Sequence, residues 1–113
     1  MSEEQAMAQA RELIQKNRVF LFMKGSPNFP QCGFSGRAVG LLRQAGADFG
    51  HFDILADPDM RAAVKVLGSW PTFPQLYVDG ELVGGSDILA EMAASGELAS
   101  LLGPQGQGSP SRN

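Results

Sequence analysis

A chain of 113 residues can bury one hydrophobic core but is short for two domains. Hydrophobic residues make up 43% and charged residues 19%, as in ordinary soluble globules, and the net charge of -3 argues against a nucleic acid or an anionic membrane as partner. The single cysteine excludes an internal disulfide, and a lone reactive thiol favours a reducing compartment. The N-terminus lacks the basic and apolar regions of a signal peptide. We therefore expect a cytoplasmic protein, or an organellar one if a presequence was removed.

Hydrophobic periodicity and turn residues predict helices that alternate with strands. Helices are indicated by apolar residues three and four positions apart, and by capping residues such as Ser2 and Asp57 at their N-termini. Strands are indicated by short apolar runs, and Asp79-Gly80 between two such runs is a strong hairpin signal. In chain order we expect a helix over 3–16, a strand over 19–23, a helix from just after Cys32 to about 45, a strand over 49–55, a helix over 59–67, hairpin strands over 75–78 and 81–83, a helix capped by Ser86 or Asp87, and a last helical segment after Gly96 that ends near 102.

This order of elements predicts an α/β fold. A strand, a helix and a second strand form a parallel, right-handed crossover, and the hairpin adds two antiparallel strands. The result is a thioredoxin-like fold, a four-stranded mixed sheet flanked by helices on both faces. We expect one domain over residues 1–102, followed by a disordered tail over 103–113, which is rich in Gly, Pro and Ser.

Cys32 lies just before the second predicted helix. The positive end of a helix dipole and the unpaired N–H groups there favour thiolate over thiol, so this sulfur is a candidate nucleophile and metal ligand. The alternative is a small buried hydrophobe, which is the commoner role of a free cysteine. The preceding segment favours the reactive thiol because it is rich in loop-forming residues. These are Gly25, Ser26, Pro27, Asn28 and Pro30.

Four motifs in this chain resemble those of the monothiol, CGFS-type glutaredoxins, and the resemblance covers residues from about 3 to 102. The motifs are Met23-Lys24-Gly25-Ser26-Pro27, Cys32-Gly33-Phe34-Ser35, Trp70-Pro71-Thr72-Phe73-Pro74-Gln75 and Gly84-Gly85-Ser86-Asp87-Ile88. The resemblance implies glutathione binding, and a homodimer that holds a two-iron, two-sulfur (2Fe-2S) cluster between two protein cysteines and two glutathione thiols. Clusters of this type usually take four thiolates, and this chain supplies only Cys32. Cys32 would then be both the redox-active residue and the iron ligand.

The resemblance also implies a glutathione site, whose cationic part is formed by two residues. Lys24 and Arg61 match family positions that hold the glycine carboxylate of glutathione, where arginine acts as a fork and lysine as a point charge. From the residues alone, solvated surface charge is the usual role of a lysine or an arginine, and only the motif match favours a binding role for these two. The full set of expected site residues is Lys24, Cys32, Arg61, Phe73, Ser86 and Asp87.

The rest of that set is expected to hold the peptide-like part of glutathione. By resemblance, the bond from Phe73 to Pro74 is cis, and the backbone of Phe73 pairs with the cysteinyl unit. Ser86 and Asp87 are expected to receive the γ-glutamyl carboxylate and ammonium at a helix N-terminus. The alternatives are an ordinary trans proline and simple helix capping.

Several residues limit the chemistry. Ser35 stands where a dithiol motif has its second cysteine, so efficient dithiol chemistry is excluded. Ser86 stands where many relatives have cysteine, which removes a two-cysteine redox cycle. We interpret His51 as a partly exposed sheet residue rather than a ligand, and we expect Trp70 to pack beside the site.

Three functions are compatible with these residues. The first is a carrier that passes a 2Fe-2S cluster to apo iron-sulfur acceptor proteins, with BolA-like proteins as further partners implied by the resemblance. The second is a glutathione-dependent monothiol oxidoreductase that removes glutathione from proteins. The third is a redox-sensing adaptor whose partners distinguish the forms with and without cluster.

Overall fold

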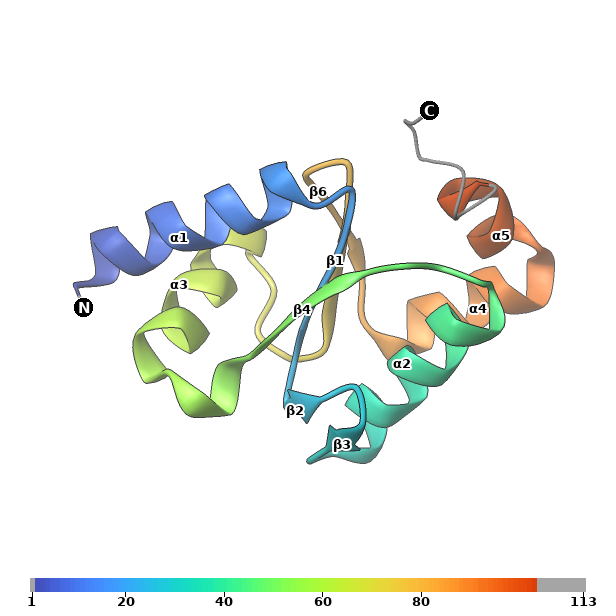
Figure 1. The fold of residues 1–113 in the computed structure, drawn as a ribbon, viewed down its shortest axis with the longest axis horizontal. Coiled ribbons are helices and arrows are strands. Elements are labelled where there is room, and N and C mark those ends of the chain that lie inside the picture. Colours follow the sequence, from blue (N-terminus) through green and yellow to red (C-terminus); the bar gives the residue numbers. More distant parts are fainter. Residues whose placement is uncertain (1, 104–113) are drawn as a thin grey trace.

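The computed structural model describes residues 2–103 (Figure 1). Its helices and strands follow one another in the predicted order, with one additional short hairpin. They are α1 (Glu3–Lys16), β1 (Val19–Met23), β2 (Gly25–Ser26), β3 (Phe29–Pro30), α2 (Gly33–Gln44), β4 (Gly50–Asp53), the 3-10 turn η1 (Ile54–Ala56), α3 (Pro58–Gly68), β5 (Gln75–Val78), β6 (Glu81–Gly84), α4 (Ser86–Ser95) and α5 (Glu97–Leu102).

The main sheet has four strands in the order β4-β1-β5-β6. β1 runs parallel to β4, with Phe22 opposite Phe52, and antiparallel to β5, with Leu21 opposite Leu76. β5 and β6 form the antiparallel hairpin that Asp79-Gly80 predicts. The predicted mixed sheet is confirmed, and β1 lies at its centre, where all five of its residues are buried.

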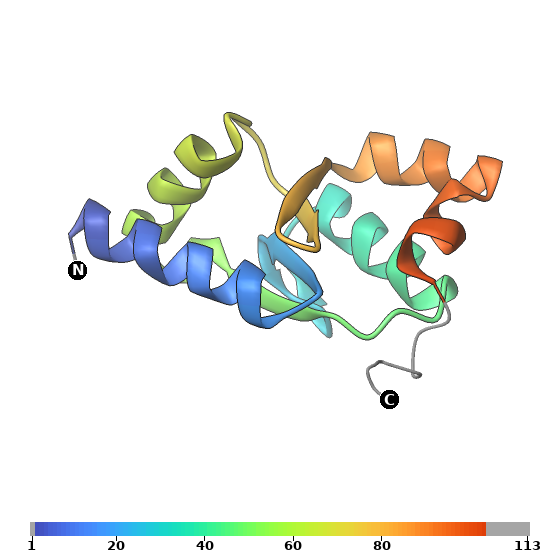
Figure 2. The ribbon, with the colours of Figure 1, turned by 90° about the horizontal axis from the view of Figure 1, so that it is seen from above.

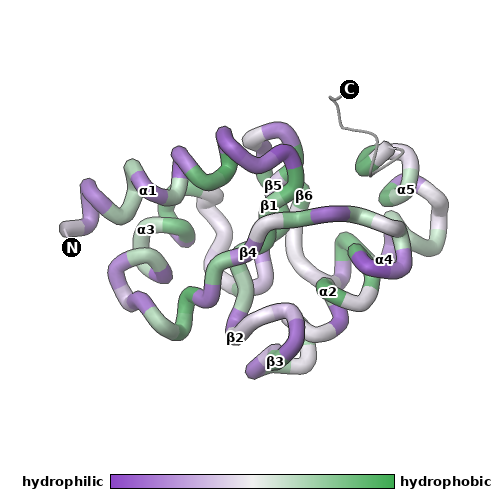
Figure 3. Tube along the Cα trace, viewed as in Figure 1, coloured by the Kyte–Doolittle hydropathy of each residue, from purple (hydrophilic) through white to green (hydrophobic). Residues whose placement is uncertain are grey.

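The two faces of the sheet carry different helical layers (Figures 1 and 2). Because successive side chains of a strand point to opposite faces, Phe20 and Phe22 pack in one core with α1 and α3. Leu21 and Met23 pack in a second core with α2, α4 and α5. Figure 3 shows β1 as a hydrophobic strand enclosed between these layers. Because its side chains alternate between the two faces, β1 contributes to both cores and so joins both helical layers to one sheet.

The predicted N-terminal caps of two helices are present. The Ser2 hydroxyl accepts the N–H of Gln5 at 3.1 Å, and the Gln5 side chain accepts the Ser2 N–H at 2.8 Å, which completes a capping box on α1. Asp57 accepts the N–H groups of Asp59 and Met60, both at 3.1 Å, at the start of α3. Local sequence thus determines where these helices begin.

Three sequence-based boundaries are corrected by the structure. The strand predicted over 49–55 is β4 over Gly50–Asp53 followed by η1, because the Asp53 carboxylate caps that 3-10 turn by accepting the Leu55 N–H. The N-cap of α4 is Gly85, with no side-chain cap, so neither Ser86 nor Asp87 caps this helix. The segment expected as a loop before Cys32 contains the short antiparallel pair β2 and β3.

The tail expected to be disordered over 103–113 lies outside the described residues, apart from Gly103. Among the helices of residues 2–103, none combines the length and the apolarity that crossing a membrane requires.

Candidate functional site

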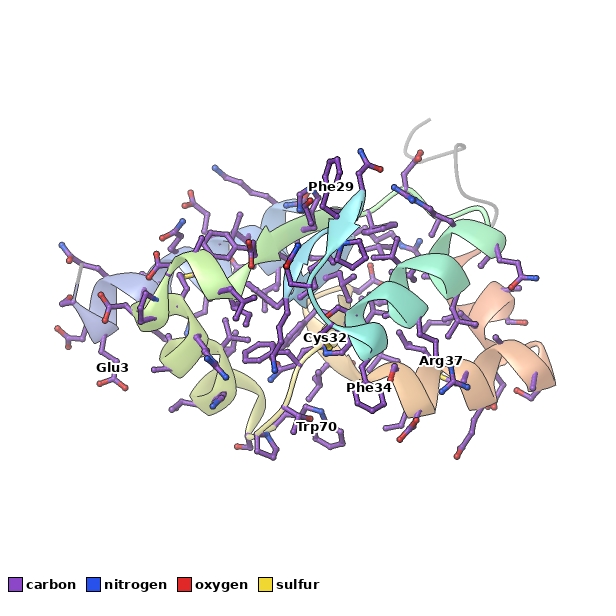
Figure 4. The ribbon with its side chains drawn as sticks, turned by 90° about the horizontal axis from the view of Figure 1, so that it is seen from below. Glu3, Phe29, Cys32, Phe34, Arg37 and Trp70 are labelled. Carbon is purple, nitrogen blue, oxygen red and sulfur yellow. The ribbon has the colours of Figure 1, made fainter. Side chains whose placement is uncertain are left out.

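A pocket of roughly 500 Å³ opens where the first turns of α2 and α4 meet the segment between α3 and β5. All six residues expected from the sequence to form a site lie around it. Figure 4 shows Cys32 at the start of α2, with Phe34 and Trp70 on the same side of the molecule. The lining residues are Lys24, Cys32, Phe34, Arg61, Lys65, Trp70, Pro71, Thr72, Phe73, Pro74, Gly85, Ser86, Asp87 and Ile88.

Cys32 is the N-cap residue of α2 and is half-buried. Its thiol makes no capping hydrogen bond of standard geometry, but nearby groups favour the charged form of the sulfur. Burial by itself would raise the pKa of the Cys32 thiol. The backbone N–H groups of Ser35 and Phe34, the Ser35 hydroxyl and the positive charge of Lys24 outweigh burial and lower that pKa. Cys32 is therefore a partly accessible sulfur with enhanced thiolate character.

Ser35 is fully buried beneath the pocket and links two of its residues. Its hydroxyl oxygen accepts the backbone N–H of Lys24 at 3.0 Å, and its side chain also stabilises the Cys32 thiolate. The oxygen that replaces a second cysteine thus joins the end of β1 to the start of α2. Ser35 cannot form a disulfide, but its side chain contributes to the lowered pKa of the Cys32 thiol.

The pocket has cations at one end and an anion at the other. Lys24 follows β1, while Arg61 and Lys65 lie one turn apart on α3. The Nε of Arg61 is buried and has no hydrogen-bond partner within residues 2–103. Asp87 lies at the opposite end and forms an exposed 3.6 Å ion pair with Arg37 of α2. An elongated ligand with carboxylates at the Arg61 end and an ammonium at the Asp87 end matches this polarity.

The segment between α3 and β5 contains the Phe73–Pro74 peptide bond, which is cis, as the resemblance implied. Phe73 is buried but precedes β5, whose ladder pairing with β1 begins at Gln75. Gly85 passes close to this segment, since a Cβ there would lie 3.2 Å from the carbonyl oxygen of Pro74. The absence of a side chain at Gly85 therefore lets the start of α4 approach the cis proline.

Sequence reasoning gave no site role to six further lining residues, of which Lys65 alone lies outside the four motifs; they are Phe34, Lys65, Pro71, Thr72, Gly85 and Ile88. The spacing of Lys65, four residues after Arg61 on a predicted helix, could have identified it, because such residues share a helix face. Trp70 lines the pocket as expected. His51 is exposed on β4 and lines a different, shallow groove, and within residues 2–103 no cluster of His, Cys, Asp and Glu is suited to a metal ion.

Comparison with known proteins identifies the family. The glutaredoxin family model matches residues 19–83. Glutaredoxin 4 of Pasteurella multocida is 54% identical over 92 residues, which cover 81% of this chain and 84% of that protein. The probable monothiol glutaredoxin GrlA of Legionella pneumophila is 58% identical over 82 residues, or 73% of this chain and 92% of that protein. This chain belongs to the monothiol glutaredoxin family.

Solved glutaredoxin structures agree with this assignment. Reduced, apo GrxS14 from poplar aligns with a TM-score of 0.73 at 45% identity, over 82% of this chain and 85% of that one. A buckwheat glutaredoxin in complex with glutathione aligns with a TM-score of 0.78 at 25% identity, over 88% and 89%. The thioredoxin-like fold expected from the sequence is confirmed.

Proposed function

We propose that this monothiol glutaredoxin binds glutathione in the Cys32 pocket and, as a glutathione-bridged homodimer, carries and transfers a 2Fe-2S cluster. One observation supports this most strongly: a single, partly accessible cysteine of lowered pKa opens onto a pocket with opposite charges at its two ends. A thiol-containing peptide that fits this polarity would bring its own sulfur next to Cys32.

Glutathione matches the pocket in charge and in order of groups. Its glycine carboxylate would bind Lys24 and the guanidinium of Arg61, both of which line the pocket. Its γ-glutamyl carboxylate would meet the N–H groups at the start of α4, and its ammonium would meet Asp87. The cysteinyl unit between them would then lie beside the Phe73 backbone and Cys32.

The binding step is tested by titrating the reduced protein with glutathione and following ¹⁵N NMR shifts, which measure weak affinities. Removal of a charge-assisted contact by Arg61→Ala should weaken binding by roughly tenfold or more. Arg11→Ala, which removes an exposed arginine of α1, is the matched control and should leave the affinity unchanged. Equal affinities of all three proteins would contradict the proposed cationic subsite.

The cluster proposal follows from the number of thiolates. A 2Fe-2S cluster usually takes four, and each copy of this chain offers one, so two chains with two glutathiones complete the set. Because glutathione is held without a covalent bond, the ligands of the cluster can dissociate one at a time. This suits a cluster that is transferred to another protein. Apo iron-sulfur proteins would be the acceptors, a BolA-like protein would be an alternative partner, and the cytoplasm, or an organelle after removal of a presequence, the proposed setting.

Anaerobic reconstitution with iron, sulfide and glutathione tests the carrier function. The expected product is a coloured species of dimer size on size-exclusion chromatography, which is lost both in Cys32→Ser and when glutathione is omitted. Failure to form a cluster under any condition would overturn the carrier proposal while leaving the glutathione titration to decide the binding site.

The lowered pKa of Cys32 also favours a second function, that of a glutathione-dependent monothiol oxidoreductase. The Cys32 thiolate would attack the glutathione sulfur of a glutathionylated protein, forming a mixed disulfide and releasing the protein thiolate. A second glutathione thiolate would then regenerate Cys32 and leave as oxidised glutathione. Turnover in a glutathione-coupled disulfide reductase assay that matches a dithiol glutaredoxin would make this the main function.

A further inference from the structure

Gln75 is a polar residue in the interior, at the start of β5. Its side chain is fully buried, and it is directed to the face of the sheet that α1 and α3 cover, the same face as Tyr77 two residues later. Burying an amide is unfavourable unless its donors and acceptor are satisfied. The partners of this amide therefore indicate its purpose.

The two donors of Gln75 reach the segment that lines the Cys32 pocket. Its Nε2 donates to the carbonyl oxygen of Trp70 at 2.9 Å and to that of Thr72 at 3.2 Å. The Trp70 N–H donates in turn to the carbonyl oxygen of Lys65 at 3.1 Å, at the end of α3. Residues 70–72 are thus bound on one side to a helix and on the other to a buried side chain.

The acceptor atom of the Gln75 side chain, Oε1, also has a hydrogen-bond partner. The Tyr77 hydroxyl donates to its Oε1 at 3.0 Å within the buried core. Gly68, the last residue of α3, makes room for this pair, because a Cβ there would lie 2.5 Å from the Tyr77 hydroxyl oxygen and 3.1 Å from the Gln75 Oε1. Each polar group of the amide therefore has a partner, and both donors are directed at the loop.

We propose that Gln75 is a positioning residue for ligand binding: its buried amide holds the backbone of residues 70–72 so that Trp70, Thr72 and the adjacent Phe73 form the wall of the Cys32 pocket. The role in ligand binding rests on the proposed glutathione site. The restraint on the loop stands on the hydrogen bonds of the chain itself. An apolar residue would fill the same space on β5 but would leave both loop carbonyls without this donor.

Gln75→Met tests the proposal, because methionine is similarly long and unbranched but has no N–H donor. We expect glutathione affinity, measured by ¹⁵N NMR titration, to fall about tenfold. Without glutathione, acrylamide should quench the fluorescence of Trp70 more strongly than in the unmodified protein. Trp70 is the only tryptophan of the chain, so this signal reports the loop directly.

Tyr77→Phe is the matched control, since it removes a buried hydrogen bond of the same network but leaves both bonds from Gln75 to the loop. In Tyr77→Phe, Trp70 quenching and glutathione affinity should stay within about twofold of the unmodified protein. Its loss of stability in urea should be similar to that of Gln75→Met. An unchanged loop and affinity in Gln75→Met would overturn the proposal. So would equal losses in the control, because the effect would then follow stability alone.

Gln75→Glu is a second variant for the case in which Gln75→Met does not fold. It keeps the size and the acceptor for Tyr77, and its protonated form regains one donor. At each pH, the glutathione affinity of Gln75→Glu is divided by that of the unmodified protein. This ratio should rise as the pH falls, and a ratio independent of pH would contradict the proposal. If the unmodified protein binds no glutathione, the proposed function fails, while Trp70 quenching still decides whether Gln75 holds the loop.

Discussion

Ser35 contributes to the lowered pKa of Cys32 although it takes no part in disulfide chemistry. Its buried hydroxyl stabilises the thiolate and accepts the Lys24 N–H. Ser35→Ala removes both interactions, so we expect the pKa of Cys32 to rise. Ultraviolet titration of the thiolate measures this pKa without ambiguity, because the chain has one cysteine. Ser95→Ala, which removes an exposed hydroxyl on α4, should leave the titration unchanged, and an equal curve for Ser35→Ala would contradict the assigned role.

Tyr77 makes the stability of the protein sensitive to alkaline pH. Burial raises its pKa from 10 to about 12. Between these values the unfolded chain has lost the phenolic proton while the folded chain retains it, so the free energy of unfolding is intact below pH 10 and falls as the pH rises toward 12. The loss approaches about 1.4 kcal/mol per pH unit in that window.

Urea unfolding between pH 9 and 12 measures this loss, and Tyr77→Phe should lack it. Because Tyr77 is the only tyrosine, tyrosinate absorbance of the folded protein reports its pKa directly. A titration midpoint near 10 in the folded state would contradict the shift.

Asp53 joins three elements through one carboxylate oxygen. Its Oδ1 accepts the N–H of Gly25 at the start of β2 and that of Leu55 in η1, both at 2.9 Å. Asp53→Ala should lower the free energy of unfolding by about 1–2 kcal/mol, since two donors lose their acceptor. It should also weaken glutathione binding, because Lys24 directly precedes Gly25.

Urea unfolding and the glutathione titration measure the two effects of Asp53→Ala. Asp48→Ala, in the exposed connection before β4, is the control and should change neither by more than about 0.5 kcal/mol. If Asp53→Ala behaves like that control, the oxygen does not join these elements in solution.

The elements that the sequence predicted correctly are those with local causes. The capping box at Ser2, the apolar run of β1 and the Asp79-Gly80 hairpin each depend on residues close together in the chain. The end of β4 was missed because apolar residues continue past Asp53 into η1, and the pair β2 and β3 was missed because two-residue strands show no alternation. The hydrogen bond from the Gly25 N–H to Asp53, which fixes the start of β2, joins residues 28 positions apart. Periodicity carries no signal for such a contact.

The sequence predicted which residues form the site, but not the buried contacts that hold them in place. Motif resemblance selected residues that the fold brings to one pocket, such as Lys24 and Asp87 from opposite ends. The backbone of Lys24 is held by a buried contact of Ser35, and the backbone of Trp70 by one of Gln75. In the sequence, Ser35 and Gln75 are simply members of their motifs. The type of a residue can indicate from the sequence that it contacts a ligand directly. The direction in which a buried hydroxyl or amide points is visible only in the packed structure.

The pocket lies at one end of the sheet and draws on both helical layers. Arg61 comes from α3 on one face, and Cys32 and Asp87 come from α2 and α4 on the other. The distance between the two charged ends therefore depends on how firmly both layers are attached to the sheet. α5 belongs to the second core through Leu98 and Leu102, both buried.

Arg18 attaches α5 to the far end of the sheet. Its guanidinium donates to the carbonyl oxygens of Leu102 at 2.6 Å and Leu101 at 3.0 Å, and its Nε lies 3.3 Å from the Asp79 carboxylate. The last carbonyls of a helix have no partner within that helix, so an arginine fork satisfies them from outside. Lysine cannot reproduce several directed donors at once.

Arg18→Ala should lower the free energy of unfolding by about 1–2 kcal/mol in urea, and Arg18→Lys should lose an intermediate amount. Native-state hydrogen exchange should accelerate in α5 first, because its six residues form too short a helix to persist alone. Arg11→Ala, an exposed arginine of α1, is the control for loss of charge alone. Since the bonds to carbonyl oxygens are local, high salt should not abolish the difference between Arg18→Ala and this control. Equal stabilities at low salt would show that α5 is held by Leu98 and Leu102 without Arg18.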